Sequence, residues 1–599
     1  MLIFPLLTAF PKHNPLGIEF FCARLRLTNT VAAEVTAMET QRKAMPVGVE
    51  DFKDLVTKNY HFVDKTRFIK ELLDARGGVT LITRPRRFGK TLTLSMLGYF
   101  FDIKGAAENC GLFTGLDIAK TGEKYMQEQG SRPVVFLTLK EVRSTGFTSM
   151  LEKLTYFLQR LYGTFAYLAD SKKLFAQEKD FFTTIWNGKG SAENMQMALL
   201  NLMSMLEKHY GEKPILLLDE YDAPILAAWE NGYYRECVDF MRGFLGSALK
   251  TNPSLGAAVL TGVTRISKES IFSGLNNLKV CSVIKEQYSD IFGFTQEEVA
   301  KLMADCGVND KLPELKQWYD GYVFGGTEIY NPWSVILFVD GGCKFQPYWL
   351  NVSGNSILHV LLEQVDEDRQ KELTGLMQGI PVEATIDEGI IYGDIYESSN
   401  ALYMMMLTTG YLKAVETYWD PTGEELPSCK LLIPNREIRL VYQKEILGWL
   451  STKSDSIQLR HMLRAMVAGD LQTFQNRLQK ILSGIISYHD AAKNPENFYH
   501  GLLLGLTVLM SSSYRIESNR ESGYGRFDIA FFPLKENAPG VILELKAAKS
   551  EEELEPKAKE ALAQIGEKAY GTELARQGVK EIWSYGISFW GKRMWMEGA

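Results

Sequence analysis

The chain has 599 residues, of which 46% are hydrophobic and 23% are charged, and its formal net charge is −7. These proportions are typical of globular domains with sizeable cores, and they exclude a disordered, collagen-like or coiled-coil protein. The negative net charge excludes a generally basic surface, so any contact with nucleic acid must be local.

The cysteines and the apolar runs predict a cytoplasmic protein with no membrane partner. None of the seven cysteines forms a CxxC pair, and their odd number favours reduced thiols over a disulfide or zinc framework. The longest apolar runs, residues 1–10 and 502–510, are about half of the roughly 20 residues needed to span a bilayer.

Residues 1–44 differ from the rest of the chain, because they show no sustained period of 3.6 or 2.0 residues. No basic residue precedes their first apolar stretch, which argues against a signal peptide. A start-like segment, MPVGVEDFKDLV, opens at Met45. We therefore expect residues 1–44 to be an unstructured leader or the product of a misplaced translation start.

The next part of the chain contains short apolar runs separated by stretches with a helical pattern. The runs are residues 79–83, 133–139, 214–220 and 256–264. Strands without polar alternation, separated by helices, predict a parallel sheet covered by helices on both faces. This pattern predicts an α/β P-loop NTPase core, AAA-like, over residues 45–284, followed by a mostly helical lid and middle region over residues 285–455.

The segment TRPRRFGKT, residues 83–91, lies between the first expected strand and an expected helix. A phosphate loop needs inward backbone N–H groups, a lysine for the β- and γ-phosphates, and a hydroxyl for Mg²⁺. Arg84 stands where the general motif has its first glycine, which leaves turnover open. The residues expected to bind the nucleotide are Arg86, Arg87, Phe88, Gly89, Lys90 and Thr91, together with Asp219 from a later strand.

The third apolar run ends in Asp219 and Glu220. A magnesium-holding aspartate and a water-activating glutamate belong at the end of such a strand. Together with the GKT segment, these residues predict ATP or another NTP as ligand, with Mg²⁺ held by Thr91 and Asp219 and with Glu220 as the catalytic base. The alternative interpretation is a strand that merely meets solvent at an acidic turn.

Residues 456–599 predict a separate α+β domain, and its chemistry lies in VILELK, residues 541–546. The strand period of two puts Glu544 and Lys546 on one face. A hairpin can bring Asp528, from the preceding expected strand, beside Glu544. Two carboxylates with a backbone carbonyl form a hard-oxygen site for Mg²⁺, and Lys546 is placed to act on a metal-bound water.

Two further residues are expected to join this C-terminal site. Glu517 lies about one strand-length before Asp528, and Gln564 lies on the helix that follows Lys546. All of these side chains can converge on one pocket, with Asp528 and Glu544 as the metal ligands. The alternative interpretation is a hairpin covered with solvated charges.

The sequence resembles a bacterial family that couples an AAA-ATPase-like domain to a C-terminal PD-(D/E)XK nuclease-superfamily domain with a restriction-endonuclease-like fold. The resemblance implies catalytic roles for Asp528, Glu544 and Lys546, and accessory roles for Glu517 and Gln564. It also implies that an arginine at position 84 is usual for the group, and it leaves a homo-oligomer open. The motifs that carry it are PVGVEDFKDL, YHFVDKTRFI, TRPRRFGKT, LLLDEYDAP, TGVTRI, IFSGLNNL, YDGYVF, YNPWS, LTTGYL, IPNREI, ESGYGRFDI, ILELK and ALAQIGEKAY.

The leading hypothesis is an ATP-binding enzyme whose Mg²⁺-dependent nuclease-like domain cleaves DNA or RNA phosphodiesters under the control of a nucleotide. Nucleic acid is then the expected partner. The alternative is a nucleotide-dependent switch or scaffold that binds nucleic acid or protein partners without cutting them.

Overall fold

The computed structural model describes most of the chain from residue 43 onward. The leader expected for residues 1–44 lies outside the described residues, apart from residues 43 and 44. The described residues are 43–75, 78–250, 252–265, 278–349, 357–358, 367–387, 389, 392, 395, 398–422, 424–450, 456–485, 507, 509–510, 513–522 and 525–599.

A five-stranded parallel sheet forms the centre of the N-terminal domain, with the strand order β2-β3-β4-β1-β5. Every residue of β1 and β3 is buried, because helices cover both faces of the sheet. The expected α/β fold is thus confirmed. The strands are β1 (Val79–Thr83), β2 (Val134–Thr138), β3 (Ile215–Asp219), β4 (Ala257–Gly262) and β5 (Leu278–Cys281).

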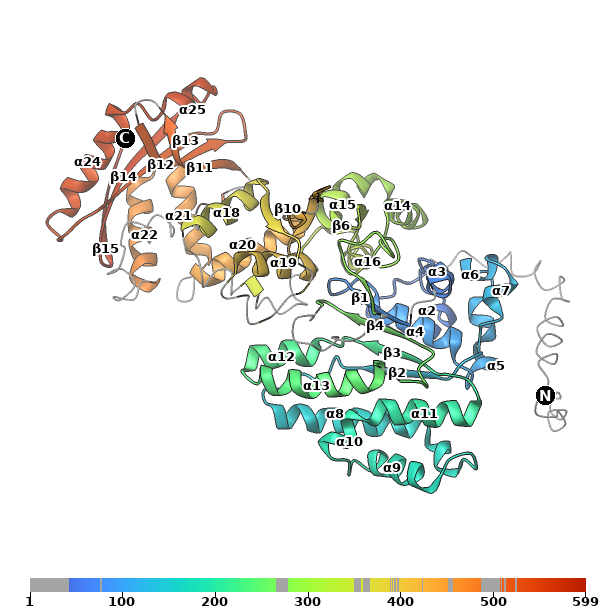
Figure 1. Ribbon diagram of the computed structural model, residues 1–599. Helices are drawn as coiled ribbons and strands as arrows, with labels where there is room; N and C mark the ends of the chain where they lie inside the picture. Colours follow the sequence, from blue (N-terminus) through green and yellow to red (C-terminus); the bar gives the residue numbers. More distant parts are fainter. Residues whose placement is uncertain are drawn as a thin grey trace. The chain divides into compact units, whose positions relative to one another are not determined.

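The helices of this domain lie on both sides of the sheet. Figure 1 shows α4 with α2 and α3 on one side, and α8, α11, α12 and α13 on the other. The chain passes from β1 to β2 at one edge of the sheet, and β3 and β4 then follow in order back toward β1. Because crossovers between parallel strands are right-handed, the helices of these two directions of travel lie on opposite faces. The helices are α2 (Phe52–Thr57), α3 (Arg67–Ala75), α4 (Lys90–Phe101), α5 (Ala106–Asn109), α6 (Asp117–Lys120), α7 (Glu123–Met126), α8 (Phe147–Thr164), α9 (Ala176–Trp186), α10 (Ala192–Gln196), α11 (Ala198–Tyr210), α12 (Ala223–Asn231) and α13 (Tyr234–Leu249).

In its described part, the middle region contains helices together with a three-stranded sheet, β8-β10-β9, and the hairpin β6–β7. These strands were not expected from the sequence because they are short and β9 is largely exposed, so it lacks an apolar pattern. The elements are α14 (Gln296–Asp305), α15 (Leu312–Tyr319), β6 (Tyr322–Phe324), β7 (Thr327–Ile329), α16 (Pro332–Asp340), α18 (Glu367–Gln378), β8 (Val382–Thr385), α19 (Ser399–Thr409), β9 (Lys413–Tyr418), β10 (Ser428–Leu432) and α20 (Arg436–Leu450).

The C-terminal domain is built on a second five-stranded sheet, with the order β11-β12-β13-β14-β15. Its strands pair antiparallel except for β13 and β14, which are parallel and are connected through α24. This is the expected α+β domain. Its elements are α21 (Ser456–Val467), α22 (Leu471–Ile485), β11 (Tyr514–Ser522), β12 (Gly525–Pro533), β13 (Gly540–Ala547), α24 (Leu554–Glu567), α25 (Thr572–Arg576), β14 (Ile582–Trp590) and β15 (Arg593–Gly598).

Side chains alternate between the two faces of β13, and each face has its own apolar core. Ile542 packs in one cluster with Ile565 of α24 and Leu574 of α25. Leu543 belongs to another cluster that contains Phe474 of α22. Because Glu544 and Lys546 follow Ile542 at intervals of two, they belong to the face that α24 covers.

The remaining sequence-based expectations concern membranes and cysteines. None of the helices in the described ranges is long and apolar enough to cross a bilayer. No disulfide joins the six cysteines that the structure describes.

Candidate functional site

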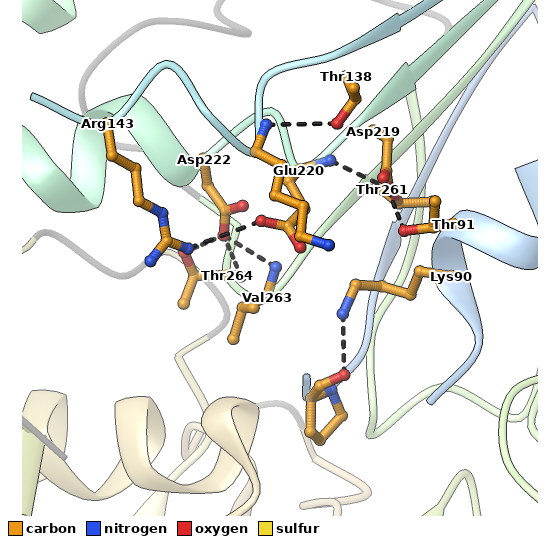
Figure 2. Close-up of polar contacts among 12 residues, drawn as sticks. Lys90, Thr91, Thr138, Arg143, Asp219, Glu220, Asp222, Thr261, Val263 and Thr264 are labelled. Atoms are coloured by element: carbon orange, nitrogen blue, oxygen red, sulfur yellow. Dashed lines mark hydrogen bonds and ion pairs between the residues drawn. The ribbon is translucent and has the colours of Figure 1, made fainter. Parts of the chain in front are cut away.

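The loops that follow the parallel strands meet at one edge of the N-terminal sheet, because parallel strands end on the same side. The phosphate-loop segment follows β1, and Asp219 and Glu220 stand at the end of β3. Strand β4 lies between β1 and β3 and contributes Thr261 to the same edge. Figure 2 shows these side chains together.

Lys90 begins α4 and is held inside the loop by backbone acceptors. Its side chain is 6% exposed, and its Nζ donates hydrogen bonds to the carbonyl oxygens of Arg84 at 3.0 Å and Pro85 at 2.8 Å. Burial lowers the pKa of Lys90. Gly89 precedes it with φ +82°, a left-handed conformation that glycine adopts without strain. The loop therefore presents a buried cation beside the positive end of a helix.

Thr91 and Asp219, the two residues expected to hold Mg²⁺ at the nucleotide, are in direct contact. The Thr91 hydroxyl donates to Asp219 Oδ2 at 2.7 Å, and the Thr261 hydroxyl donates to Asp219 Oδ1 at 2.6 Å. Asp219 is fully buried, so its carboxylate is oriented by both neighbours. Thr261 was not singled out from the sequence, although its place at the end of an apolar run was a usable signal.

Glu220 adopts a left-handed backbone conformation with φ +49°, which is uncommon for a residue with a side chain. Its carboxylate lies 3.6 Å from the guanidinium of Arg143, measured from Oε2 to Nη2. Burial raises the pKa of Glu220, and the nearby Lys90 opposes this effect. A carboxylate with a raised pKa beside a phosphate loop is suited to accept a proton from water.

A cavity of 430 Å³ opens beside the phosphate loop, within the range of small-molecule sites. Its polar wall includes Lys140 and Arg143, from the loop after β2, together with Glu220. Its apolar wall includes Val49 and Phe294. Six of the seven residues expected to bind the nucleotide line this cavity: Arg86, Arg87, Phe88, Gly89, Lys90 and Thr91. The seventh, Asp219, does not line the cavity and contacts Thr91 instead.

Sequence reasoning missed part of this wall. Lys140 and Arg143 follow the second apolar run, and the rule that parallel strands end at one edge was sufficient to find them. The strand rule could not find Trp333, because this residue lies at the start of α16. The centre of its ring is 4.1 Å from the guanidinium carbon of Arg87. This stacking holds Arg87, which has φ +71°, at the rim of the cavity.

In the C-terminal domain, Asp528 and Glu544 lie side by side on neighbouring strands. The backbone N–H of Asp528 donates to Glu544 Oε2 at 3.3 Å, and the backbone N–H of Leu545 donates to Asp528 Oδ2 at 2.7 Å. The two strands pair Ile529 with Leu543, so the next residues outward are Asp528 and Glu544. The hairpin thus brings the two carboxylates together.

Glu544 is the buried member of this pair, with 3% exposure. Burial and the charge of Asp528 raise the pKa of Glu544 to about 8. Gln564 of α24 donates a hydrogen bond from its amide to Glu544 Oε1 and another to the hydroxyl of Tyr570 at 3.2 Å. Tyr570 was not expected from the sequence, since only the turn after α24 brings it to this place.

Lys546 and Glu517 lie on the same face of the sheet as the carboxylate pair. Lys546 shares the strand face of Glu544, and among the described residues no salt bridge or hydrogen bond of its ammonium group is present. Glu517 pairs with Ala530 across β11 and β12, and its carboxylate forms an ion pair with Arg515 at 3.2 Å. Glu517 therefore lies on the same sheet face as Asp528, and it forms an ion pair with an arginine of its own strand.

The donor set fits a divalent cation held by oxygen ligands. The adjacent carboxylates of Asp528 and Glu544 repel each other when both are ionised, which contributes to the raised pKa of Glu544, and a bound cation would relieve this repulsion. In the described part of the chain, no group of three or more His, Cys, Asp or Glu side chains converges. A cation at this site would be held by Asp528 and Glu544, the two residues expected as its ligands.

Comparisons with known proteins agree with both sites. Residues 46–272 match the family described as "Predicted AAA-ATPase", and residues 494–598 match the family described as "PD-(D/E)XK nuclease superfamily". The chain joins an AAA-ATPase-like domain to a PD-(D/E)XK nuclease-superfamily domain. The AAA-ATPase-like match contains Lys90 and Asp219, and the nuclease-superfamily match contains Asp528 and Glu544. The resemblance inferred from the sequence is confirmed.

The chain is also similar to another protein over most of its length. An uncharacterized protein of the vnfD 5′ region of Azotobacter chroococcum mcd 1 is 25% identical over 560 residues, which cover 92% of this chain and 96% of the relative. The similarity thus extends through the middle region that separates the two family matches.

Proposed function

We propose that this protein uses the nucleotide state of its AAA-ATPase-like domain to regulate Mg²⁺-dependent cleavage of DNA or RNA by its C-terminal domain. The observation that carries the proposal is the adjacent carboxylate pair of Asp528 and Glu544, in which Glu544 is buried beneath α24 and Lys546 lies on the same strand face. A hairpin covered only with solvated charges does not bury a glutamate in this way.

Each residue of the nuclease-like site has a distinct task in this proposal. Asp528 and Glu544 would hold Mg²⁺, which when bound polarises a phosphodiester and lowers the pKa of a water molecule. Gln564 orients Glu544 through its amide, so that the carboxylate faces the ligand in one rotamer. Lys546 supplies a positive charge for the scissile phosphate or accepts a proton from the attacking water.

The nucleotide site supplies the regulatory input. Lys90 is placed to bind the β- and γ-phosphates, while Thr91 and Asp219 would hold the Mg²⁺ of the nucleotide. Lys140 and Arg143 add positive charge to the same cavity wall. Glu220 orients and deprotonates the attacking water. Hydrolysis of ATP then returns the domain from its ATP-bound state to its ADP-bound state.

The test is a cleavage assay with the full chain on plasmid DNA, single-stranded DNA and RNA, with Mg²⁺ or Mn²⁺ and with or without ATP. Metal-dependent cleavage that changes with ATP supports the proposal. Binding of nucleic acid without cleavage, under every metal and nucleotide condition, overturns it in favour of the switch or scaffold.

Metal affinity is expected to rise with pH up to about 8 and then to level off, because the pKa of Glu544 is raised to about 8 by burial and by Asp528. The cation binds the ionised carboxylate, so each pH unit below this value lowers the apparent affinity by about tenfold. Calorimetric titration with Mn²⁺ at several pH values measures this slope.

The same pKa predicts how the metal-free domain responds to pH. Between about 4.5 and 8 the folded state keeps a proton that the unfolded state releases, so stability decreases as pH rises. In a Glu544→Gln variant, neither the metal affinity nor the stability of the metal-free domain is expected to change with pH in this way. Wild-type metal affinity that is constant from about pH 6 to 8 would contradict the interpretation.

A Glu220→Gln variant is expected to bind ATP with unchanged affinity and to lose hydrolysis. The amide keeps the volume of the side chain but cannot accept the proton from water. A loss of about a hundredfold or more in turnover is expected, since general base catalysis contributes roughly 10²–10⁴-fold. Phosphate release measures turnover, and equal turnover in both proteins would remove Glu220 from the mechanism.

A further inference from the structure

Arg84 stands at the first position of the phosphate loop, where the general motif has a glycine, and its side chain leads away from the nucleotide cavity. Arg84 does not line the cavity, unlike its neighbours Arg86 and Arg87. Its side chain is 0% exposed. Since a nucleotide in the cavity cannot contact this guanidinium, Arg84 does not bind phosphate directly, and its role depends on its contacts within the protein.

The guanidinium of Arg84 binds three backbone carbonyl oxygens. Nη1 donates to Thr83 at 2.9 Å and to Cys281 at 2.8 Å, and Nη2 donates to Tyr288 at 3.1 Å. Cys281 ends β5, and Tyr288 follows in the segment that leads to the middle region. The side chain therefore ties the start of the loop to a segment about 200 residues away in sequence.

The backbone of Arg84 extends this connection to the neighbouring strand and to the loop lysine. Its N–H donates to the carbonyl of Gly262, at the end of β4, at 3.1 Å. Its carbonyl oxygen accepts the hydrogen bond from Lys90 Nζ at 3.0 Å. Since β4 and β5 flank β1 on its two sides, Arg84 connects both neighbouring strands to the residue expected to bind phosphate.

The surroundings of the guanidinium are apolar as well as hydrogen-bonding. Its central carbon lies 5.0 Å from the ring centre of Phe324 and 5.6 Å from that of Phe292. No carboxylate forms a salt bridge with it in the described part of the chain. A buried cation without an acidic partner is costly, and aromatic faces offset only part of that cost. A glycine would avoid the cost but would also lose these connections.

We propose that Arg84 is a positioning residue that fixes the phosphate loop against the ends of β4 and β5, so that Lys90 is presented to the β- and γ-phosphates of a nucleotide. The inference rests on the proposed nucleotide site, but it concerns a residue that does not touch the ligand. Its consequence is that the glycine of the general motif is unsuitable in this loop.

The test compares ATP and AMP binding by the full chain and by the variants Arg84→Gly, Arg84→Met and Arg84→Lys. The glycine and methionine variants are expected to bind ATP at least about tenfold more weakly than the wild type. AMP lacks the phosphates that Lys90 would hold, so its affinity is expected to change less than about twofold. Lysine keeps the charge but not the planar pair of donors, and is expected to give an intermediate loss.

The matched control is Arg160→Met, the same chemical change at an exposed position of α8, which is expected to leave ATP affinity unchanged. Circular dichroism establishes which variants are folded at the assay temperature, and Arg84→Lys, the smallest change, carries the test if the others unfold.

Two outcomes would overturn the role proposed for Arg84 and leave the nucleotide site in place. The first is a folded Arg84→Gly or, failing that, Arg84→Lys variant that binds ATP as tightly as the wild type. The second is an equal loss of ATP and AMP affinity, which indicates damage to the whole cavity. A wild-type chain that binds no ATP instead overturns the nucleotide site itself.

Discussion

Replacing Glu544 by glutamine or Asp528 by asparagine is expected to abolish metal-dependent cleavage while leaving the domain folded. Each substitution removes one of the two carboxylates that would hold the cation, but keeps the shape of the side chain. Loss of several kcal/mol of transition-state stabilisation corresponds to a rate decrease of roughly 10³-fold. Cleavage of a labelled substrate measures the rate, and stabilisation of the fold by Mn²⁺ measures metal binding.

Lys546→Ala separates metal binding from chemistry in the same assay. This variant is expected to keep the stabilisation by Mn²⁺, since the two carboxylates remain, and to lose cleavage. The matched control is Lys549→Ala, a neighbouring exposed lysine on the loop after β13. Carboxylate variants that behave like this control, within about 0.5 kcal/mol of wild-type stability and with normal metal binding, would refute the site.

Replacing Lys90 by alanine is expected to weaken ATP binding so far that no binding is seen at the ATP concentrations at which the wild type is saturated. The ammonium group is buried at the start of α4 and hydrogen-bonded to loop carbonyls within the cavity wall. Loss of its charge-assisted bonds to phosphate is expected to cost about 3 kcal/mol, or roughly a hundredfold in affinity. Calorimetric titration with ATP measures the change.

Lys172→Ala, at an exposed position before α9, is the control for this experiment. It is expected to bind ATP like the wild type. The Lys90→Ala protein must also retain the stabilisation of its C-terminal domain by Mn²⁺, since the carboxylate pair lies on a different sheet from the phosphate loop. Unchanged ATP affinity in Lys90→Ala would mean that the GKT segment is not a phosphate loop.

The amino-acid sequence by itself determined the features that depend on local pattern. The apolar runs that form β1 to β4 could be predicted as strands, because a strand buried on both faces has no alternation of polar and apolar residues. The positions of Asp219 at the end of β3 and of Lys90 at the start of α4 followed from these boundaries. The shared strand face of Glu544 and Lys546 followed from the period of two.

Only the tertiary structure decided which of these residues meet. The strand order places β4 between β1 and β3, and this order brings Thr91 to Asp219 and adds Thr261. The folded chain also brings Trp333 onto Arg87. Such contacts join residues far apart in sequence, so no local period or spacing announces them.

The same reason explains Arg84 and the two glutamates Glu544 and Glu517, whose surroundings the sequence left open. In the sequence, Arg84 is only a departure from the general phosphate-loop motif. The folded chain shows that its guanidinium binds the backbone carbonyls of Cys281 and Tyr288. Glu544 is buried because α24 packs over its strand, whereas Glu517 pairs with Arg515. Charge and spacing are properties of a segment, but burial and pairing depend on what the rest of the chain packs against it.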